Sequence, residues 1–231
     1  HFADEMMIFQ NGWFPVGVVM AAWPVLLVIF ALCAKQAWVS VSQHRSAFLV
    51  AAVMLPLAWS LNASPESGQL AGMSYHLLAL NLTALMLGTS AAFCLGVLLF
   101  FPYLWLWGDW HMFPINALSI LLPPLLVNLG FRYWVSRLPA NIFIFIFLNG
   151  FWAAAVGMVF TGVILVGLLD WADVFDTSVL WKTAFPVFFL IAWAEAFLSG
   201  ISTAIFIALK PQWICTFDDD RYLKSAPKIW Q

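Results

Sequence analysis

Residues 77–107 read LLALNLTALMLGTSAAFCLGVLLFFPYLWLW, an unbroken apolar stretch that decides how often the chain crosses a membrane. A single helix of 31 residues would rise about 46 Å, whereas a hydrocarbon core is roughly 30 Å thick. Gly88-Thr89-Ser90 offers a natural break, because glycine interrupts a helix and serine or threonine can cap the next one. The stretch therefore predicts two membrane helices separated near residue 88.

The composition of the whole chain agrees with a membrane protein. Of its 231 residues, 64% are hydrophobic and 9% are charged, more apolar surface than a soluble domain of this length could bury. The apolar runs are continuous, which excludes the alternating strands of a membrane β-barrel. We predict an all-α, polytopic bundle of about seven spans, at residues 15–34, 47–62, 76–88, 91–107, 115–135, 141–169 and 183–209.

The few charges give the predicted bundle an orientation. With seven crossings and an outer start, eight of the nine Lys and Arg residues fall on the inner side: Lys35, Arg45, Arg132, Arg137, Lys210, Arg221, Lys224 and Lys228. Lys182 falls outside, with most of the acids: Asp4, Glu5, Glu66, Asp109, Asp170, Asp173 and Asp176. Basic residues near short inner loops set membrane orientation. We expect one domain with an outer segment (1–14), a helical bundle (15–209) and a cytoplasmic tail (210–231).

Several function classes are disfavoured by what the sequence contains. A net charge of −2 gives no basis for binding nucleic acid. Three cysteines at inner positions do not suggest a structural disulfide or a thiolate metal site. There is no Gly-rich phosphate loop ending in Lys-Ser/Thr, so we expect no ATPase activity of the chain's own and no catalytic cofactor.

Histidines share the predicted outer face with the acids. His1 heads the sequence given; a free amine and an imidazole there would suit nickel, copper or cobalt, and the alternative is a frayed, solvated end. His76 lies where the second outer loop enters the third span, half buried, either a ligand or an interfacial side chain bonded to a carbonyl. His111 in Gly108-Asp109-Trp110-His111 fits an ordinary interfacial loop.

Glu195 lies near the centre of the last predicted span without a basic neighbour in the sequence. A carboxyl group at that depth is costly and is either functional or paired. We expect a packing role in preference to metal ligation. The side chains that could satisfy it are the asparagines of other spans: Asn81, Asn116, Asn128 and Asn149.

These residues resemble a known family. His1-Phe2-Ala3-Asp4 is similar to the Met-His-Ile-x-Asp/Glu-Gly start of the CbiM/NikM proteins, the substrate-capture subunits of energy-coupling-factor transporters for cobalt and nickel. Residues 72–88 resemble the family's S-x-x-H-P-T-G-T-G-L-G-A-I-L-F-G segment, with His76 on its histidine and Leu77-Leu78 in place of Pro-Thr. Residues 115–118 match at Asn116 a later G-A-N-x-F-S-M run, and residues 194–200 resemble E-G-L-L-T-G.

The similarity is strongest to a less characterised proteobacterial branch of this permease group. Residues 137–147 (RLPANIFIFIF) and 211–223 (PQWICTFDDDRYL) resemble that branch's R-L-P-x-N-x-F-x-Y/F-I-F stretch and P-E-W-V-A-T-F-D-D-x-R-Y-L ending. The resemblance implies a multi-pass protein of the bacterial inner membrane that captures Ni²⁺ or Co²⁺, with Cu²⁺ less favoured. It implies His1 and His76 as metal ligands. It also implies a membrane coupling subunit and cytoplasmic ATPase subunits as partners.

Two other functions remain open at this point. One is a copper-binding membrane enzyme that uses His1, His76 and His111 with an open coordination position. The other is a non-catalytic assembly subunit whose histidines bind nothing.

Overall fold

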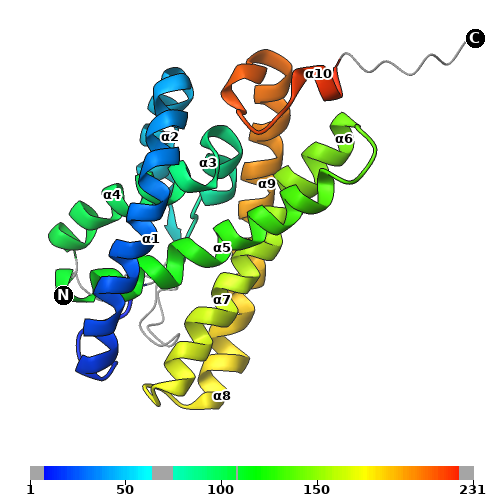
Figure 1. Cartoon of the computed structure of the whole chain (residues 1–231). Helices are drawn as coiled ribbons and strands as arrows, with labels where there is room; N and C mark the ends of the chain where they lie inside the picture. The colour runs from blue at the N-terminus through cyan, green and yellow to red at the C-terminus, as the bar shows by residue number, and fades with distance from the viewer. Residues whose placement is uncertain (1–7, 64–74, 108, 224–231) are drawn as a thin grey trace, which may run out of the picture.

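The computed structural model describes residues 8–63, 75–107 and 109–223, and these residues form a helical bundle (Figure 1). Single helices of the bundle are α1 (Val16–Gln43), α2 (Arg45–Ser60), α3 (Leu80–Leu87), α4 (Thr89–Trp107) and α5 (Phe113–Val135), the last preceded by η1 (Trp110–Met112). Two further helices are composite: α6 (Ile142–Ile144), η2 (Phe145–Trp152) and α7 (Ala153–Trp171), then α8 (Thr177–Val179), η3 (Leu180–Ala184) and α9 (Phe185–Leu209). The all-α class is confirmed.

Five of the described helices are long and apolar enough to cross a membrane: 16–43, 89–106, 110–135, 142–171 and 177–209. The shorter α2 is also apolar. The chain is therefore a polytopic membrane protein.

The prediction of a span at 76–88 is wrong. Gly88 does break the apolar stretch, with a left-handed φ of 85°, so the division itself is confirmed. The first half, however, is an extended segment followed by the eight-residue α3, which rises only about 12 Å. Every residue of α3 is buried. Its apolar side chains are covered by protein and not by lipid, a difference that hydropathy cannot detect.

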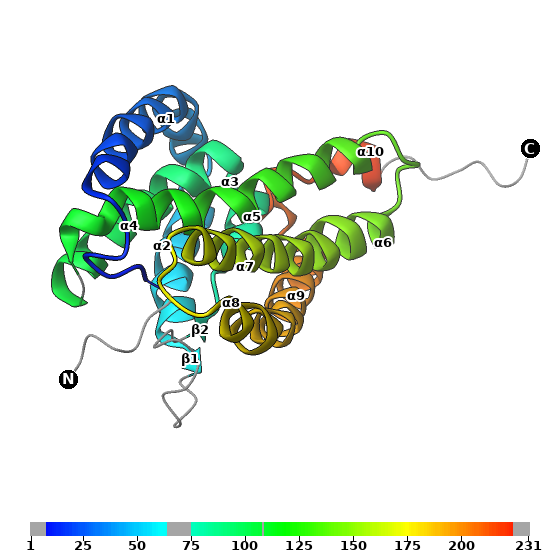
Figure 2. The same cartoon turned by 90° about the horizontal axis from the view of Figure 1, so that it is seen from below.

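Close helix contacts in one half of the bundle depend on small residues. α7 lies between α5 and α9 and packs on both (Figure 2). A side chain at Gly162 of α7 would overlap the ring of Phe188 on α9, and one at Gly157 would press on Pro124 of α5. Glycine therefore sets how near these helices approach, as is common between membrane helices.

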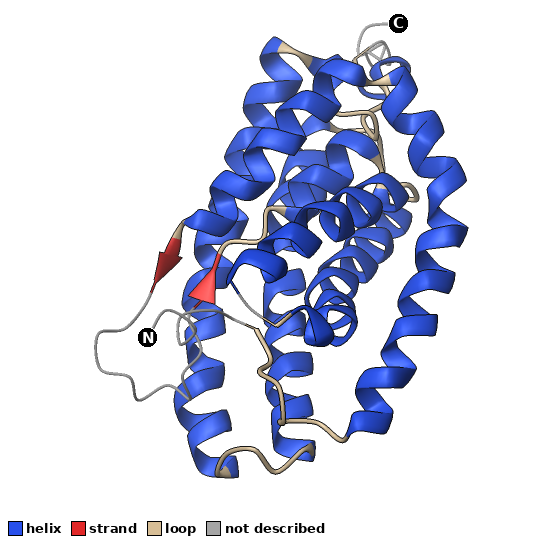
Figure 3. Ribbon diagram, turned by 90° about the vertical axis from the view of Figure 1, so that its left-hand side faces the viewer, coloured by secondary structure: helices blue, strands red, loops and turns tan. Residues whose placement is uncertain are grey.

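A two-residue strand pair lies next to the helices (Figure 3). β1 (Asn62–Ala63) follows α2, and β2 (Tyr75–His76) leads toward α3. The strands are antiparallel, with Asn62 opposite His76 and Ala63 opposite Tyr75. This pairing fixes the backbone of His76 against the end of α2.

The segment after α9 turns back onto the bundle through η4 (Pro211–Trp213) and α10 (Asp219–Tyr222). The amide of Cys215 donates to the carbonyl of Met86 at 3.2 Å, and the amide and hydroxyl of Thr216 donate to the carbonyl of Leu85 at 3.2 and 2.8 Å. The last carbonyls of α3, which have no partner within the helix, are thereby satisfied.

Charged residues separate between the two ends of the bundle. Arg45 begins α2, Arg132 lies in the last turn of α5 and Arg221 lies in α10, at the upper end in Figure 1. Asp173 and Asp176 lie near α8 at the opposite end. The upper end is called the basic end below; its assignment to the cytoplasm stays a prediction, as do the domain boundaries.

Candidate metal-binding site

His76 is the sequence-predicted ligand that the structure describes, and it is more deeply buried than expected. Its side chain is 2% exposed, so the expectation of a half-buried, interfacial histidine is wrong. The segment Tyr75–Ala79, called the His76 segment below, consists of β2 and the three residues that join it to α3, and lies in the bundle interior. Protein therefore surrounds His76, which hydropathy had placed at the junction of an outer loop and a span.

The imidazole of His76 uses one of its two nitrogens within the protein. Nδ1 lies 3.0 Å from the carbonyl oxygen of Leu77. Since a carbonyl only accepts, Nδ1 carries the proton in this contact and Nε2 keeps a free lone pair. Nε2 is buried and has no hydrogen-bond partner among the described residues. A buried lone pair on neutral imidazole is costly to leave unused, and it is a good donor to nickel, cobalt or copper.

Glu195 holds the backbone immediately after this histidine. Its Oε2 accepts from the amide of Leu78 at 2.9 Å, and its Oε1 accepts from the amide of Ala79 at 2.6 Å. The carboxyl group is 3% exposed. The expected packing role is correct in kind, but the expected asparagine partners are wrong: Glu195 serves two main-chain donors that would otherwise be buried without a partner.

Two aromatic residues fix the rest of the His76 segment. Trp59 of α2 donates from Nε1 to the carbonyl of Leu78 at 3.0 Å. The Tyr75 hydroxyl donates to the carbonyl of Ala184, which directly precedes α9, at 3.1 Å. Ala79 has a left-handed φ of 54°, an uncommon conformation for a residue with a Cβ. Protein groups thus satisfy this irregular backbone, as the interior of a membrane bundle requires.

Three of the four asparagines expected to serve Glu195 form a separate network. Asn81 of α3 donates to the carbonyl of Asn149 and to Ser199 Oγ, both at 2.8 Å, and Asn128 donates to Asn81 Oδ1 at 2.8 Å. This network joins α3 to three other helical segments. It anchors the helix that begins just after the His76 segment.

Asn116 of α5 anchors the chain near its start. The amide of Phe9 donates to Asn116 Oδ1 at 2.6 Å, and Asn116 Nδ2 donates back to the carbonyl of Phe9 at 3.1 Å. Asn116 is fully buried, and Phe9 is 2% exposed. His1, the other predicted ligand, lies outside the described residues, as do Asp4 and Glu5.

His111 occupies a different environment. Its side chain is 61% exposed, its Nδ1 lies 2.8 Å from Asp109 Oδ1, and its ring lies against Trp110. His111 is thus an exposed side chain of η1, and its place at the membrane interface stays a prediction. Among the residues described, no group of three His, Cys, Asp or Glu side chains is placed to hold a metal ion.

Burial governs the protonation of His76, which lies between helices and not within a spanning one. Loss of hydration lowers the pKa of His76 below its ordinary value of 6.5, and this effect outweighs the opposing hydrogen bond to Leu77. The imidazole is therefore neutral at pH 7, the form that binds a metal.

Sequence reasoning missed Trp59 and Tyr75, since nothing in a lone aromatic residue shows which carbonyl it will meet. Asn116 carried a signal only through the family resemblance.

The comparison with protein families agrees with this arrangement. The CbiM family model, described as cobalt uptake substrate-specific transmembrane region, matches residues 9–213. The matched range contains the His76 segment, Glu195 and Asn116. No curated protein matches the chain at a significant level.

Proposed function

Because the chain belongs to the CbiM family of cobalt uptake substrate-specific transmembrane regions, we propose that it is the substrate-capture subunit of an energy-coupling-factor ABC transporter. Membership makes it a membrane component of cobalt uptake. The proposal adds that it binds Co²⁺ or Ni²⁺ from the outer side of the bacterial inner membrane.

The observation that carries this proposal is the orphaned Nε2 of His76. Most of the His76 segment is tied to its neighbours: the amides of Leu78 and Ala79 bond Glu195, the Leu78 carbonyl bonds Trp59, and the Tyr75 hydroxyl bonds Ala184. A framework that satisfies the backbone while leaving one buried imidazole nitrogen free is suited to presenting that nitrogen to a ligand. Rigid support of this kind is what metal ligands generally have.

His1 is proposed as the second imidazole donor. The Asn116–Phe9 contact supports this by tethering the segment that leads back to His1. Phe9 lies eight positions after His1, an extended reach of at most about 28 Å. The imidazoles of His1 and His76 would together give two nitrogen donors, which suit cobalt and nickel.

Transport energy must come from other proteins, since the chain has no phosphate-binding loop. A membrane coupling subunit and cytoplasmic ATPase subunits are the proposed partners.

The first test is metal binding by the purified full chain. Co²⁺ and Ni²⁺ are titrated into wild type, His1→Ala, His76→Ala and the matched control His111→Ala, followed by calorimetry and metal analysis. We expect about one equivalent bound by wild type and by His111→Ala, and none by His76→Ala. Uptake in cells expressing the candidate partners is then the second measurement.

Each outcome has a clear meaning. Absence of specific binding by wild type at neutral pH would contradict metal capture. Binding that survives His76→Ala but not His1→Ala would place the metal elsewhere. Binding without partner-dependent uptake would contradict the transporter assembly and leave the site intact.

The copper-enzyme alternative requires His111 next to His76. The exposure of one side chain and the burial of the other do not favour it. A redox activity that disappears in His111→Ala would reverse this preference.

A further inference from the structure

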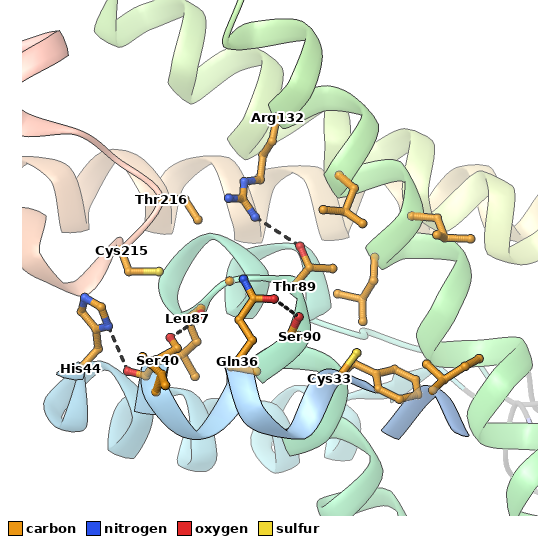
Figure 4. A pocket seen from close by; sticks show the side chains of 18 of the residues that line it. Cys33, Gln36, Ser40, His44, Leu87, Thr89, Ser90, Arg132, Cys215 and Thr216 are labelled. Carbon is orange, nitrogen blue, oxygen red and sulfur yellow. Dashed lines mark hydrogen bonds between the residues drawn. The ribbon is translucent and has the colours of Figure 1, made fainter. Parts of the chain in front are cut away.

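A second feature lies at the basic end of the bundle, in contacts that metal capture does not use. A cavity of about 620 Å³ opens there between α1, the start of α4, α5 and the returning tail (Figure 4). Cys215 and Thr216, which close the last turn of α3, form part of its wall. The cavity is therefore separated from His76 by the length of α3.

One wall of the cavity is polar, with side chains from α1, α4 and α5. Arg132 donates to Thr89 Oγ1 at 3.2 Å, and Ser90 Oγ donates to Gln36 Oε1 at 2.8 Å (Figure 4). His44 and Ser40 line the same wall (Figure 4). The hydroxyls of Ser90 and Ser40 and Nδ1 of His44 are bonded within the protein, so the guanidinium of Arg132 supplies the charged donors for anything that enters.

The charge on this wall is positive and unbalanced. A guanidinium has five N–H donors, and Thr89 is the one partner found for Arg132 among the described residues. No Asp or Glu is among the described residues that line the cavity. Arg132 forms no ion pair with a described carboxylate. A cation in a membrane helix is usually paired or faces a ligand.

The start of α4 adds to the attraction for an anion. Gly88, Thr89 and Ser90 bring the first turn of this 19-residue helix to the cavity. Amides of a first helical turn have no partner within the helix, and the helix dipole makes this end positive. An added Cβ at Gly88 would meet nothing within 4 Å, so the backbone there is open to approach.

Part of the rim of the cavity is apolar. Val39, Leu126 and Leu129 line it, and their side chains are 47%, 56% and 47% exposed. On a membrane-spanning bundle, such side chains face acyl chains. A positive wall beside exposed apolar side chains matches a lipid with a phosphate headgroup.

We propose that this cavity binds the phosphate of an anionic phospholipid from the leaflet at the basic end. Arg132 and the first turn of α4 hold the phosphate, and the acyl chains lie along Leu126 and Leu129. A free phosphate ion would share the headgroup chemistry but would not need the apolar rim. An acidic segment of a partner protein is another possible occupant, and it could enter only a cavity that holds no lipid.

Native mass spectrometry of the full chain in detergent tests the proposal. Phosphatidylglycerol and phosphatidylcholine with identical acyl chains are added to wild type, to Arg132→Gln and to Arg137→Gln. Arg137 is the matched control, because it is exposed at the same end and stacks on Tyr133. We expect wild type and Arg137→Gln to retain phosphatidylglycerol about fivefold better than phosphatidylcholine, and Arg132→Gln to lose that preference.

The comparison of the two lipids on wild type stands even if Arg132→Gln does not fold, and Arg132→Lys supplies a variant that keeps the charge. Equal retention of the two lipids by wild type would overturn the proposal. The proposal would also fail if Arg132→Gln kept the wild-type preference for phosphatidylglycerol. Displacement of bound lipid by millimolar inorganic phosphate would indicate a free-anion site instead. Loss of the lipid when the transporter partners assemble would indicate a protein segment as the occupant.

Discussion

Glu195 and Arg132 both lie in long apolar helices, yet the protein treats them in opposite ways. Both carboxyl oxygens of Glu195 accept main-chain hydrogen bonds, and the group is sealed from solvent. The guanidinium of Arg132 has one partner in the described chain, Thr89, and faces a cavity. The first group holds the fold together around His76, whereas the second keeps most of its donors available.

The difference shows how to separate structural from functional charges in a membrane bundle. A polar group that is fully used within the protein cannot bind anything else without breaking those contacts. A group with unused donors or lone pairs can. His76 resembles Arg132 in having an unused polar atom, because its Nε2 is buried without a described partner. It does so although Glu195 holds the backbone next to it.

The largest effect is expected from Glu195→Ala. It leaves the amides of Leu78 and Ala79 without acceptors in the bundle interior, at about 1–3 kcal/mol each, so we expect a loss of about 2–6 kcal/mol of stability. Glu195→Gln keeps one acceptor and should lose roughly half as much. Thermal unfolding in detergent measures both, with the exposed Asp173→Asn as control. A shift equal to that of the control would contradict the structural role.

Asn81→Leu should have the next largest effect. It removes the acceptor of Asn128 and the donor to Asn149 and Ser199. Hydrogen bonds between membrane helices contribute modestly, so we expect a loss of about 1–2 kcal/mol. The same unfolding assay applies, and exposed Gln212→Leu serves as the comparison. A loss as large as that of Glu195→Ala would mean that the network, and not the carboxyl group, holds α3.

Metal-free protein should lose stability as pH falls through 6.5. Burial lowers the folded-state pKa of His76, so below 6.5 the unfolded chain binds more protons than the folded one. One proton changes stability by at most about 1.4 kcal/mol per pH unit. Unfolding of wild type and His76→Gln between pH 7.5 and 5.5 tests this. The slope should shrink in His76→Gln and persist in His111→Ala; identical slopes in all three would exclude His76 as its source.

Arg132→Gln should have the smallest effect on stability. The substitution removes one described hydrogen bond and no ion pair, so we expect a change within about 1 kcal/mol. Unfolding in lipid-free detergent is the relevant measurement. A loss comparable to that of Glu195→Ala would show that Arg132 is structural, and the comparison between the two charges would fail.

The sequence predicts the architecture well because membrane spans and charge bias depend on local composition. The break at Gly88 is such a local feature. The span at 76–88 failed because an apolar run reads the same whether lipid or protein covers it. Glu195 was recognisable as a buried group needing partners, but its partners are main-chain amides more than a hundred residues away. No local pattern encodes that contact, and the same is true of the carbonyls that Trp59 and Tyr75 reach.

The capping of α3 at both ends has a consequence for biosynthesis. Glu195 follows its partners Leu78 and Ala79 by 117 and 116 residues, and Thr216 follows Leu85 by 131. While the ribosome is still extending the chain, the segment around His76 can be threaded into the membrane but cannot yet adopt its native backbone. It must wait for α9, and α3 must wait for the returning tail. The part of the bundle proposed to meet the metal is thus translated early and completed last.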